Sequence, residues 1–338
     1  MCVGVWKGNI LGSLIFPKLF RTFALPMEPV KPRALKRGDL IGLVSPASPI
    51  ADLSRIDQAV RYLESLGYRV RTGDHVTASH GYLAGNDCDR AADLHAMFAD
   101  RSVRAVFCIR GGYGTPRLLH LLDYRLIRNN PKIVAGYSDI TALELALWRK
   151  ARLITFHGPM AGVDLAGPPD PFTEEMFWSM LSSKKKRGPI LLAGPSPKGL
   201  RPGRASGRLL GGNLALVVSL MGTPYQPDLR EALLFLEDIS EEPYRIDRML
   251  TQLHNAGILR RSGAILTGQF TDCVPQDTSK PSLSLGQILE ETAELAGRPF
   301  LSGLPFGHES PKMTLPVGLR ARIDAGAGTL EFLEAAVR

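Results

Sequence analysis

The chain has 338 residues, of which 44% are hydrophobic and 22% are charged, the composition of a soluble globular protein with the length for two domains of roughly 150 residues each. The net charge of +8 is spread along the chain, and the densest basic run, Lys184-Lys185-Lys186-Arg187, has no interleaved aromatic residues, which favours a solvated linker over a nucleic-acid partner. The four cysteines show no Cys-x-x-Cys spacing, which favours free thiols in a reducing compartment over a metal site or a disulfide framework.

Residues 1–33 are predicted to form a non-catalytic N-terminal extension. Charged residues and a proline interrupt the apolar residues before Met27, so neither a signal peptide nor a membrane span of about 20 apolar residues is expected there. We interpret this stretch as an extension from an upstream start, with the folded protein beginning near Met27.

Residues 34–166 alternate apolar runs with amphipathic stretches, which predicts strands that alternate with helices. Because such alternation gives right-handed βαβ units, we expect an α/β fold with an open parallel sheet in this N-terminal domain. The predicted strands are Leu40–Ser45, Arg69–Thr72, Val103–Ile109, Lys132–Ala135 and Leu153–Phe156. The predicted helices are Asp52–Leu66, Ala91–Phe98, Thr115–Leu122 and Asp139–Lys150.

Residues 167–202 are rich in Pro, Gly, Ser and Lys around one amphipathic piece, Phe172–Leu181, and we interpret them as a linker between domains. Residues 203–338 are predicted to form a second domain. Its expected strands are Leu233–Leu236, Ala264–Leu266 and Thr329–Leu333. Its expected helices are Tyr244–Ala256 and Leu285–Ala296.

The segment Gly136-Tyr137-Ser138-Asp139-Ile140 places a serine between a predicted strand and a predicted helix. A hydroxyl in such a turn projects from the carboxyl end of a sheet, beside the free N–H groups of the helix, and this suits a nucleophile. The match to the Gly-x-Ser-x-Gly elbow is incomplete, because Ile140 stands in place of the second glycine. Taken alone, the segment is either a different nucleophile turn or an ordinary helix N-cap.

A glycine-rich run, Arg110-Gly111-Gly112-Tyr113-Gly114, follows the predicted strand Val103–Ile109. Three glycines in four positions let backbone N–H groups approach an anion or an oxyanion closely. The run matches neither the dinucleotide fingerprint nor the P-loop. By itself it is equally compatible with a tight turn between a strand and a helix.

An acid and two histidines have suitable positions to serve a nucleophile. Glu237 follows the predicted strand Leu233–Leu236 directly, so it can be held rigidly enough to orient a histidine, although a solvated acidic loop is the alternative. His157 and His308 lie in glycine-flanked segments that are predicted to be loops. A turn serine, a strand-end acid and a loop histidine, in this order, favour acyl transfer.

Together these segments resemble the LD-carboxypeptidase family, the serine peptidases that include muramoyltetrapeptide carboxypeptidase and the microcin-immunity proteins. The resemblance runs from about Arg37 to the C-terminus, and residues 1–26 lie outside it. Its motifs, in chain order, are Gly38-Asp39, Val44-Ser45-Pro46-Ala47-Ser48, Gly81-Tyr82-Leu83-Ala84-Gly85, Arg90-Ala91-Ala92-Asp93-Leu94, Arg110-Gly111-Gly112-Tyr113-Gly114, Gly136-Tyr137-Ser138-Asp139, His157-Gly158-Pro159, Gly211-Gly212-Asn213-Leu214, Leu236-Glu237-Asp238 and Gly307-His308.

The resemblance implies a catalytic triad of the nucleophile Ser138, the histidine His308 and the charge-relay residue Glu237. It also implies two oxyanion donors, the backbone N–H of Asp139 and that of one of the paired glycines, with Gly112 preferred over Gly111.

For the whole molecule, the resemblance implies an N-terminal Rossmann-like domain that carries the nucleophile and a C-terminal β/α domain that carries the Glu–His pair. It implies further that the protein uses no metal or organic cofactor, lies in the cytoplasm and forms a homodimer. The segment Tyr244-Arg245-Ile246-Asp247-Arg248 resembles the murein-recycling branch of the family rather than the immunity branch.

The resulting hypothesis is hydrolysis of the amide bond before the terminal D-alanine of a murein tetrapeptide, through an acyl-enzyme. Arg110 is a candidate for binding the free carboxylate of the substrate, with a structural ion pair as the alternative. Two rival functions remain at this point. An α/β-hydrolase-like esterase shares the order of the triad but expects glycine in place of Ile140, and a non-enzymatic ligand-binding domain would leave Ser138 as a helix cap.

Overall fold

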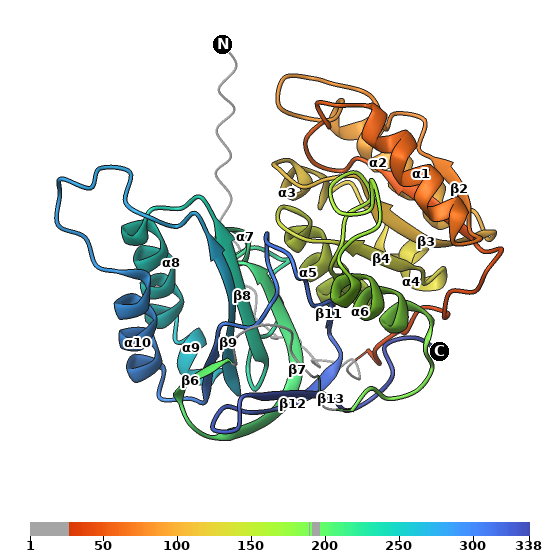
Figure 1. Cartoon of the computed structure of the whole chain (residues 1–338). Coiled ribbons are helices and arrows are strands. Elements are labelled where there is room, and N and C mark those ends of the chain that lie inside the picture. The colour runs from red at the N-terminus through yellow and green to blue at the C-terminus, as the bar shows by residue number, and fades with distance from the viewer. Residues whose placement is uncertain (1–26, 189, 191–196) are drawn as a thin grey trace, which may run out of the picture.

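The computed structural model describes residues 27–188, 190 and 197–338, so most of the predicted N-terminal extension and part of the predicted linker lie outside the described residues. The chain forms two β-sheets that lie side by side, each covered by helices (Figure 1). The predicted α/β fold in two domains is therefore confirmed.

The first sheet has six strands in the order β11-β5-β4-β3-β1-β2. Strands β1 to β5 pair in parallel, as predicted, whereas β11 pairs antiparallel with β5 and was not predicted. The strands are β1 (Leu40–Val44), β2 (Arg69–Thr72), β3 (Val103–Cys108), β4 (Ile133–Gly136), β5 (Thr155–His157) and β11 (Leu315–Val317).

Helices cover both faces of the first sheet, because alternate residues of a buried strand point to opposite faces. In β3, Ala105 and Phe107 belong to the same apolar cluster as residues of α1 and α6, whereas Val106 and Cys108 cluster with residues of α2 and α4. The helices of this half are α1 (Ser54–Ser65), α2 (Asp87–Ala99), α3 (Thr115–Leu118), α4 (Tyr124–Asn129), α5 (Ile140–Ala151) and α6 (Pro171–Ser182).

One predicted helix of this half was wrong in extent. The helix expected over Thr115–Leu122 ends at Leu118 as α3, and a separate helix, α4, follows it. The division arises at Asp123, whose side chain accepts hydrogen bonds from the backbone N–H groups of Arg125 and Leu126 and so begins a new helix.

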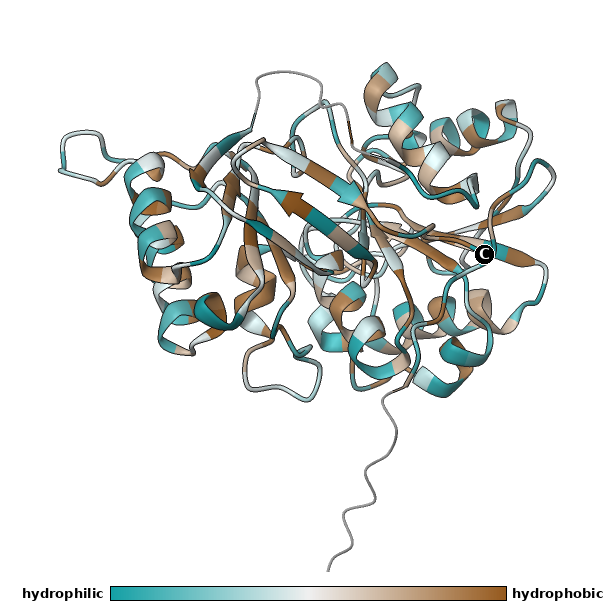
Figure 2. Cartoon of the chain, turned by 90° about the horizontal axis from the view of Figure 1, so that it is seen from below, coloured by the Kyte–Doolittle hydropathy of each residue, from teal (hydrophilic) through white to brown (hydrophobic). Residues whose placement is uncertain are grey.

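The second sheet has seven strands in the order β13-β12-β7-β8-β9-β10-β6. Its four central strands, β7 to β10, pair in parallel, and the strands outside them pair antiparallel. The strands are β6 (Lys198–Arg201), β7 (Arg204–Asn213), β8 (Leu233–Ile239), β9 (Ala264–Thr271), β10 (Phe300–Ser302), β12 (Arg320–Asp324) and β13 (Thr329–Phe332). The helices are α7 (Leu214–Ser219), α8 (Pro243–Asn255), α9 (Ile258–Arg261) and α10 (Leu285–Ala296). Hydrophobic residues follow the strands, and hydrophilic residues lie on the outer faces of the helices (Figure 2).

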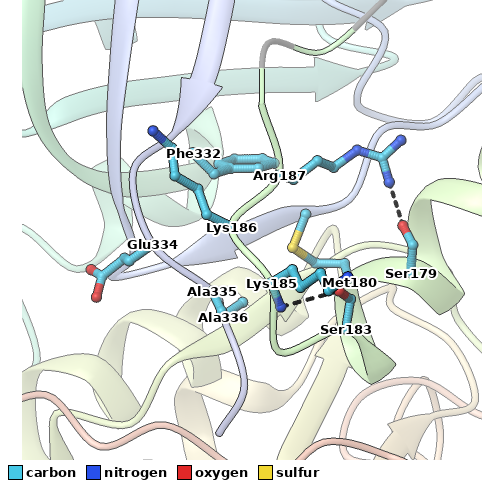
Figure 3. Close-up of a pocket in the computed structure, with 10 residues that line it drawn as sticks. All are labelled: Ser179, Met180, Ser183, Lys185, Lys186, Arg187, Phe332, Glu334, Ala335 and Ala336. Carbon is cyan, nitrogen blue, oxygen red and sulfur yellow. Dashed lines mark hydrogen bonds between the residues drawn. The ribbon is translucent and has the colours of Figure 1, made fainter.

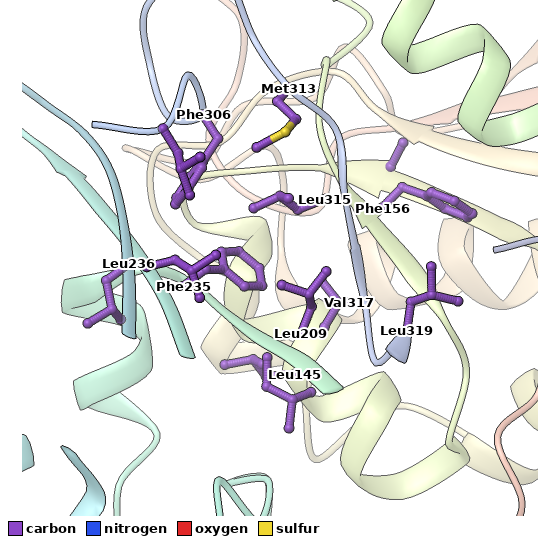
Figure 4. Close-up of a cluster of buried hydrophobic side chains, with 14 of the residues drawn as sticks. Leu145, Phe156, Leu209, Phe235, Leu236, Phe306, Met313, Leu315, Val317 and Leu319 are labelled. Atoms are coloured by element: carbon purple, nitrogen blue, oxygen red, sulfur yellow. The ribbon is translucent and has the colours of Figure 1, made fainter. Parts of the chain in front are cut away.

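One hydrophobic core runs through both sheets (Figure 4). Leu145 of α5, Phe156 of β5, Leu209 of β7, Phe235 of β8 and Val317 of β11 all lie buried in it. Ten of the twelve residues of α5 are buried, because this helix lies between the two halves of the molecule. The halves that carry the predicted catalytic residues therefore share one packed core.

Candidate active site

Ser138 lies in the turn between β4 and α5 with a backbone φ of 62°. This left-handed conformation is uncommon for a residue other than glycine, and it marks a sharp turn that the surrounding structure holds in place. The N-cap position of α5 belongs to Asp139, so Ser138 is not the helix cap that the sequence left open as an alternative.

Gly111 packs directly against Ser138. A Cβ on Gly111 would lie 2.8 Å from the Cβ and 3.0 Å from the Oγ of Ser138, so only glycine permits this approach. The next residue, Gly112, has a φ of 105° and packs against Ser48, whose Oγ accepts a hydrogen bond of 3.0 Å from the N–H of Tyr113. The glycine run is thus part of the wall around the serine.

Of the two predicted oxyanion donors, Asp139 lies at the turn between β4 and α5, and Gly112 lies in the glycine-rich loop beside it. Within the part of the chain that the structure describes, the backbone N–H groups of Gly112 and Asp139 donate to no acceptor. Free N–H groups beside a nucleophile and at the start of a helix are suited to stabilising an oxyanion.

The side chain of Asp139 joins the glycine-rich loop to the serine turn. Its Oδ2 accepts a hydrogen bond of 2.8 Å from the N–H of Thr115, and the hydroxyl of Thr115 donates to the carbonyl of Asp139. Burial raises the pKa of the Asp139 carboxyl to about 6, against the opposing effect of the hydrogen bonds from Thr115. Sequence reasoning considered only the backbone of Asp139 and missed this contact, because no local pattern relates residues that are 24 positions apart.

Glu237 and His308 form a hydrogen-bonded pair, in which the carboxylate Oε2 lies 2.8 Å from the imidazole Nδ1. Glu237 is fully buried in β8, at the point where the register with β9 shifts, and such a bulge re-aims a side chain. His308 lies in the loop after β10, with its side chain 12% exposed. A carboxylate at Nδ1 fixes the orientation of the ring and leaves Nε2 available for proton transfer.

Ser138 and the Glu237–His308 pair come from different sheets. Tyr137, the neighbour of Ser138, packs edge to face against the imidazole of His308, with ring centroids 5.0 Å apart. Among the described residues no hydrogen bond joins Ser138 to His308, whose hydrogen-bond partner is Glu237. Nucleophile–base hydrogen bonds are often long before substrate binds and tighten in the complex.

The second candidate histidine, His157, was wrongly placed in a loop. It ends β5 and is buried, with Nδ1 3.3 Å from Oε2 of Glu144 on α5. Burial lowers the pKa of His157 to about 3 and raises the pKa of Glu144 well above its usual value, so this pair is uncharged. The neighbouring glycine suggested a loop, but Gly158 continues the contacts between the strands, because its N–H donates a hydrogen bond of 3.0 Å to the carbonyl of Gly136.

Arg110 lies beside the paired glycines and is half-buried. Its Nη1 donates a hydrogen bond of 3.1 Å to the backbone carbonyl of Pro49. No ion pair involves Arg110 among the described residues, so the alternative of a structural ion pair is not supported there.

The basic run lies near a cavity that is separate from these residues (Figure 3). The cavity is formed by the end of α6, the residues that follow it and the C-terminal segment. Lys186 and Arg187 line it and form ion pairs with Glu331 and Glu175, respectively. Two cations of the run therefore have carboxylate partners within the protein.

Two family models match the chain: the LD-carboxypeptidase N-terminal domain over residues 41–158 and the LD-carboxypeptidase C-terminal domain over residues 206–323. The chain belongs to the LD-carboxypeptidase family. The family expected from the sequence motifs is thus confirmed, and both matched regions contain candidate catalytic residues.

This LD-carboxypeptidase is similar to curated and solved members of its family. The probable murein peptide carboxypeptidase of Bacillus subtilis (strain 168) is 46% identical over 301 residues, which cover 88% of this chain and 93% of that protein. The muramoyltetrapeptide carboxypeptidase from Oxalobacter formigenes has a TM-score of 0.75 at 32% identity, covering 86% of this chain and 97% of that structure. The structure of MccF in complex with glutamyl sulfamoyl guanosine has a TM-score of 0.83 at 25% identity, and the match covers 92% of this chain and 100% of that structure.

These matches support a hydrolase of the serine carboxypeptidase type. In the described part of this LD-carboxypeptidase, no helix has the length and apolar character needed to cross a membrane. Residues 27–188, 190 and 197–338 also contain no cluster of three or more His, Cys, Asp or Glu side chains suited to holding a metal ion.

Proposed function

We propose that this LD-carboxypeptidase is a muramoyltetrapeptide carboxypeptidase, which hydrolyses the amide bond before the terminal D-alanine of murein tetrapeptides. The observation that carries the proposal is the hydrogen bond of 2.8 Å between Glu237 and His308, together with the turn that presents Ser138. The names of the relatives from Bacillus subtilis and Oxalobacter formigenes support the substrate class.

In the acylation step, Oγ of Ser138 attacks the carbonyl carbon of the amide while Nε2 of His308 takes the hydroxyl proton. Glu237 stabilises the resulting imidazolium and keeps Nδ1 protonated. The negative charge on the carbonyl oxygen is stabilised by the N–H groups of Gly112 and Asp139, each worth roughly 10²–10³ in kcat.

The tetrahedral intermediate collapses with cleavage of the C–N bond, and the imidazolium of His308 gives its proton to the departing amine of D-alanine. A water molecule then attacks the ester carbonyl of the acyl-enzyme, with His308 again taking the proton. Cleavage of the ester returns that proton to Oγ of Ser138 and releases the tripeptide.

An exopeptidase also binds the free carboxylate of its substrate, and Arg110 is our candidate for this contact. Its Nη2 lies 3.6 Å from the position that a Cβ on Gly112 would occupy, so a guanidinium is available beside the oxyanion donor. A guanidinium can bind a carboxylate through two parallel hydrogen bonds.

The proposal includes a cytoplasmic location and a homodimer. Three cysteines of the described chain, Cys88, Cys108 and Cys273, are free thiols, which supports a reducing compartment. Light scattering coupled to size-exclusion chromatography measures the oligomeric state, and a mass of one chain would contradict the dimer.

The replacement Ser138→Ala tests the function. Because it removes the nucleophile, we expect kcat for release of D-alanine from a murein tetrapeptide to fall by roughly 10⁴-fold or more. The melting temperature should change little, since the substitution removes a single hydroxyl. Mass spectrometry of the products and a thermal melt measure the two quantities.

Assays of this variant and of other substrates distinguish the proposed function from its alternatives. Undiminished release of D-alanine by the Ser138→Ala variant would contradict the assignment of the nucleophile. Hydrolysis of nitrophenyl esters without hydrolysis of the tetrapeptide would favour an esterase. Hydrolysis of an aminoacyl sulfamoyl nucleoside in preference to the tetrapeptide would favour the microcin-immunity branch, to which the structural likeness to MccF is relevant.

A further inference from the structure

A chain of five aromatic rings, four of them buried, joins the two halves of the molecule at the candidate catalytic residues. Each ring packs edge to face against the next, and the chain ends two residues from where it begins, in the loop after β10. In order, its members are His308, Tyr137, His157, Phe235 and Phe306, and we call this set the aromatic bracket.

The bracket crosses between the halves twice. Tyr137 meets His308 with ring centroids 5.0 Å apart at an interplanar angle of 76°, and His157 meets Phe235 at 5.4 Å and 68°. Within the N-terminal half, Tyr137 and His157 are 6.2 Å apart, and within the C-terminal half, Phe235 and Phe306 are 5.7 Å apart. Edge-to-face pairs have a preferred geometry, so two crossings restrict both the distance and the angle between the halves.

Each member of the triad is close in sequence to a ring of the bracket. Tyr137 immediately precedes Ser138. Phe235 lies two residues before Glu237 on the same strand, β8. Phe306 lies two residues before His308 in the same loop. A shift of one ring therefore moves a catalytic residue with it.

The ring of Tyr137 is also held at its far end. Its hydroxyl accepts a hydrogen bond of 2.8 Å from Nζ of the buried Lys312, which forms an ion pair with Asp164. Lys312 comes from the C-terminal half, whereas Tyr137 and Asp164 come from the N-terminal half. The hydroxyl of Tyr137 therefore adds one more contact between the halves.

We propose that the aromatic bracket sets the distance between Oγ of Ser138 and the imidazole of His308, and that Tyr137 and Phe235 are positioning residues of the reaction. The inference rests on the proposed function for its activity assay. It follows from the geometry, because Glu237 orients His308 only within its own half, and nothing in that pair places the imidazole relative to the serine of the other half.

The substitution Phe235→Leu tests the bracket at a ring that does not itself contact His308. We expect kcat for the tetrapeptide to fall by about 10–100-fold, because a misplacement of about 1 Å is enough for such a loss, with KM changed far less. The matched control is Phe300→Leu, in the same sheet. Phe300 is equally buried but lies outside the bracket, so its replacement should lower the melting temperature without lowering kcat.

Substitutions at Tyr137 separate the ring from the hydroxyl. Tyr137→Phe keeps the ring and should retain most of kcat, whereas Tyr137→Leu should lose it. In the double variant Tyr137→Leu/Phe235→Leu, the losses should be far from additive, because both substitutions disrupt the same set of contacts. If Tyr137→Leu does not fold, the comparison of Phe235→Leu with Phe300→Leu still decides the question.

Two readouts report on the site without the peptide. The imidazole NMR signals of His308 should shift in Phe235→Leu but not in Phe300→Leu, and labelling of Ser138 by a fluorophosphonate should slow in Phe235→Leu alone. Unchanged His308 signals together with a kcat equal to that of Phe300→Leu would overturn the bracket. If the wild-type protein releases no D-alanine while labelling of Ser138 still slows only in Phe235→Leu, the aromatic bracket stands and the proposed substrate is wrong. Equal labelling rates in the two variants would overturn the aromatic bracket.

Discussion

The buried pair of His157 and Glu144 gives folding a pH dependence that can be derived group by group. In the folded protein, burial favours the neutral form of both groups, because it lowers the pKa of His157 to about 3 and raises the pKa of Glu144. In the unfolded chain, the ordinary values of 6.5 and 4.5 apply. Between these two values both states bind one proton at the pair, so the pair adds little pH dependence there.

Outside that window the proton count differs between the two states. Above 6.5 the unfolded pair has lost its protons, whereas the raised pKa of Glu144 holds its proton to a higher pH than in the unfolded chain. Stability therefore falls as the pH rises through the folded pKa of Glu144. Below 4.5 the unfolded pair binds two protons and the folded pair one, so stability also falls in acid.

The substitution Glu144→Gln tests this account. It keeps the size and a hydrogen-bonding group but removes the titration, so stability should fall less steeply with rising pH than in the wild type. Urea unfolding of both proteins at about pH 6.5 and pH 8.5 measures the difference. Equal slopes for the two proteins would mean that Glu144 is ionised in the folded state.

At the scale of elements, the turn between β4 and α5 depends on the loop after β3. The space beside Ser138 is occupied by Gly111, and the two segments are tied together by Asp139 and Thr115. The conformation of Ser138 is therefore set by segments that follow neighbouring strands of one sheet rather than by its own turn alone.

The substitution Gly111→Ala should lower kcat by about 100-fold, because its Cβ would displace the side chain of Ser138. A matched control is Gly167→Ala, where an added Cβ meets nothing within 4 Å, and its activity should equal that of wild type. Steady-state release of D-alanine measures both. Full activity of the Gly111→Ala variant would show that the turn around Ser138 can move without a loss of kcat.

Local patterns predicted those elements whose signals are local. The strand before Ser138 and the helix after it were found because an apolar run meets a helical repeat there, and the predicted range Leu285–Ala296 coincides with α10. The pairing of β11 with β5 could not be found, since Leu315–Val317 is short, contains a proline and gains its place only from a distant partner. The aromatic bracket could not be predicted for the same reason, because contacts between rings of different halves produce no periodic pattern in the sequence.

Across the whole molecule, the two halves also meet through a hydrogen bond at the start of α5. The backbone N–H of Asn213 donates to Oγ1 of Thr141 over 3.0 Å, and the site is buried. Asn213 then holds Asp238 through its side-chain amide, beside Glu237. Helix α5, which follows Ser138, and strand β8, which carries Glu237, are thereby connected.

Replacing Thr141 with valine should lower the free energy of unfolding by about 1–3 kcal/mol, because it leaves the buried N–H of Asn213 without an acceptor. Thr141→Ser keeps the hydroxyl and should lose less. Urea denaturation of the two variants measures the difference. Equal stabilities would mean that this hydrogen bond contributes nothing to holding the halves together.

The antiparallel strand β11 has a consequence for the order in which the protein is made. The sheet that carries Ser138 is completed at β5 only by residues 315–317, close to the end of the chain. During synthesis the N-terminal half leaves the ribosome first, with its serine in place but with an unpaired sheet edge and without His308. Each new chain can therefore complete this edge of the sheet only after residues 315–317 have been made.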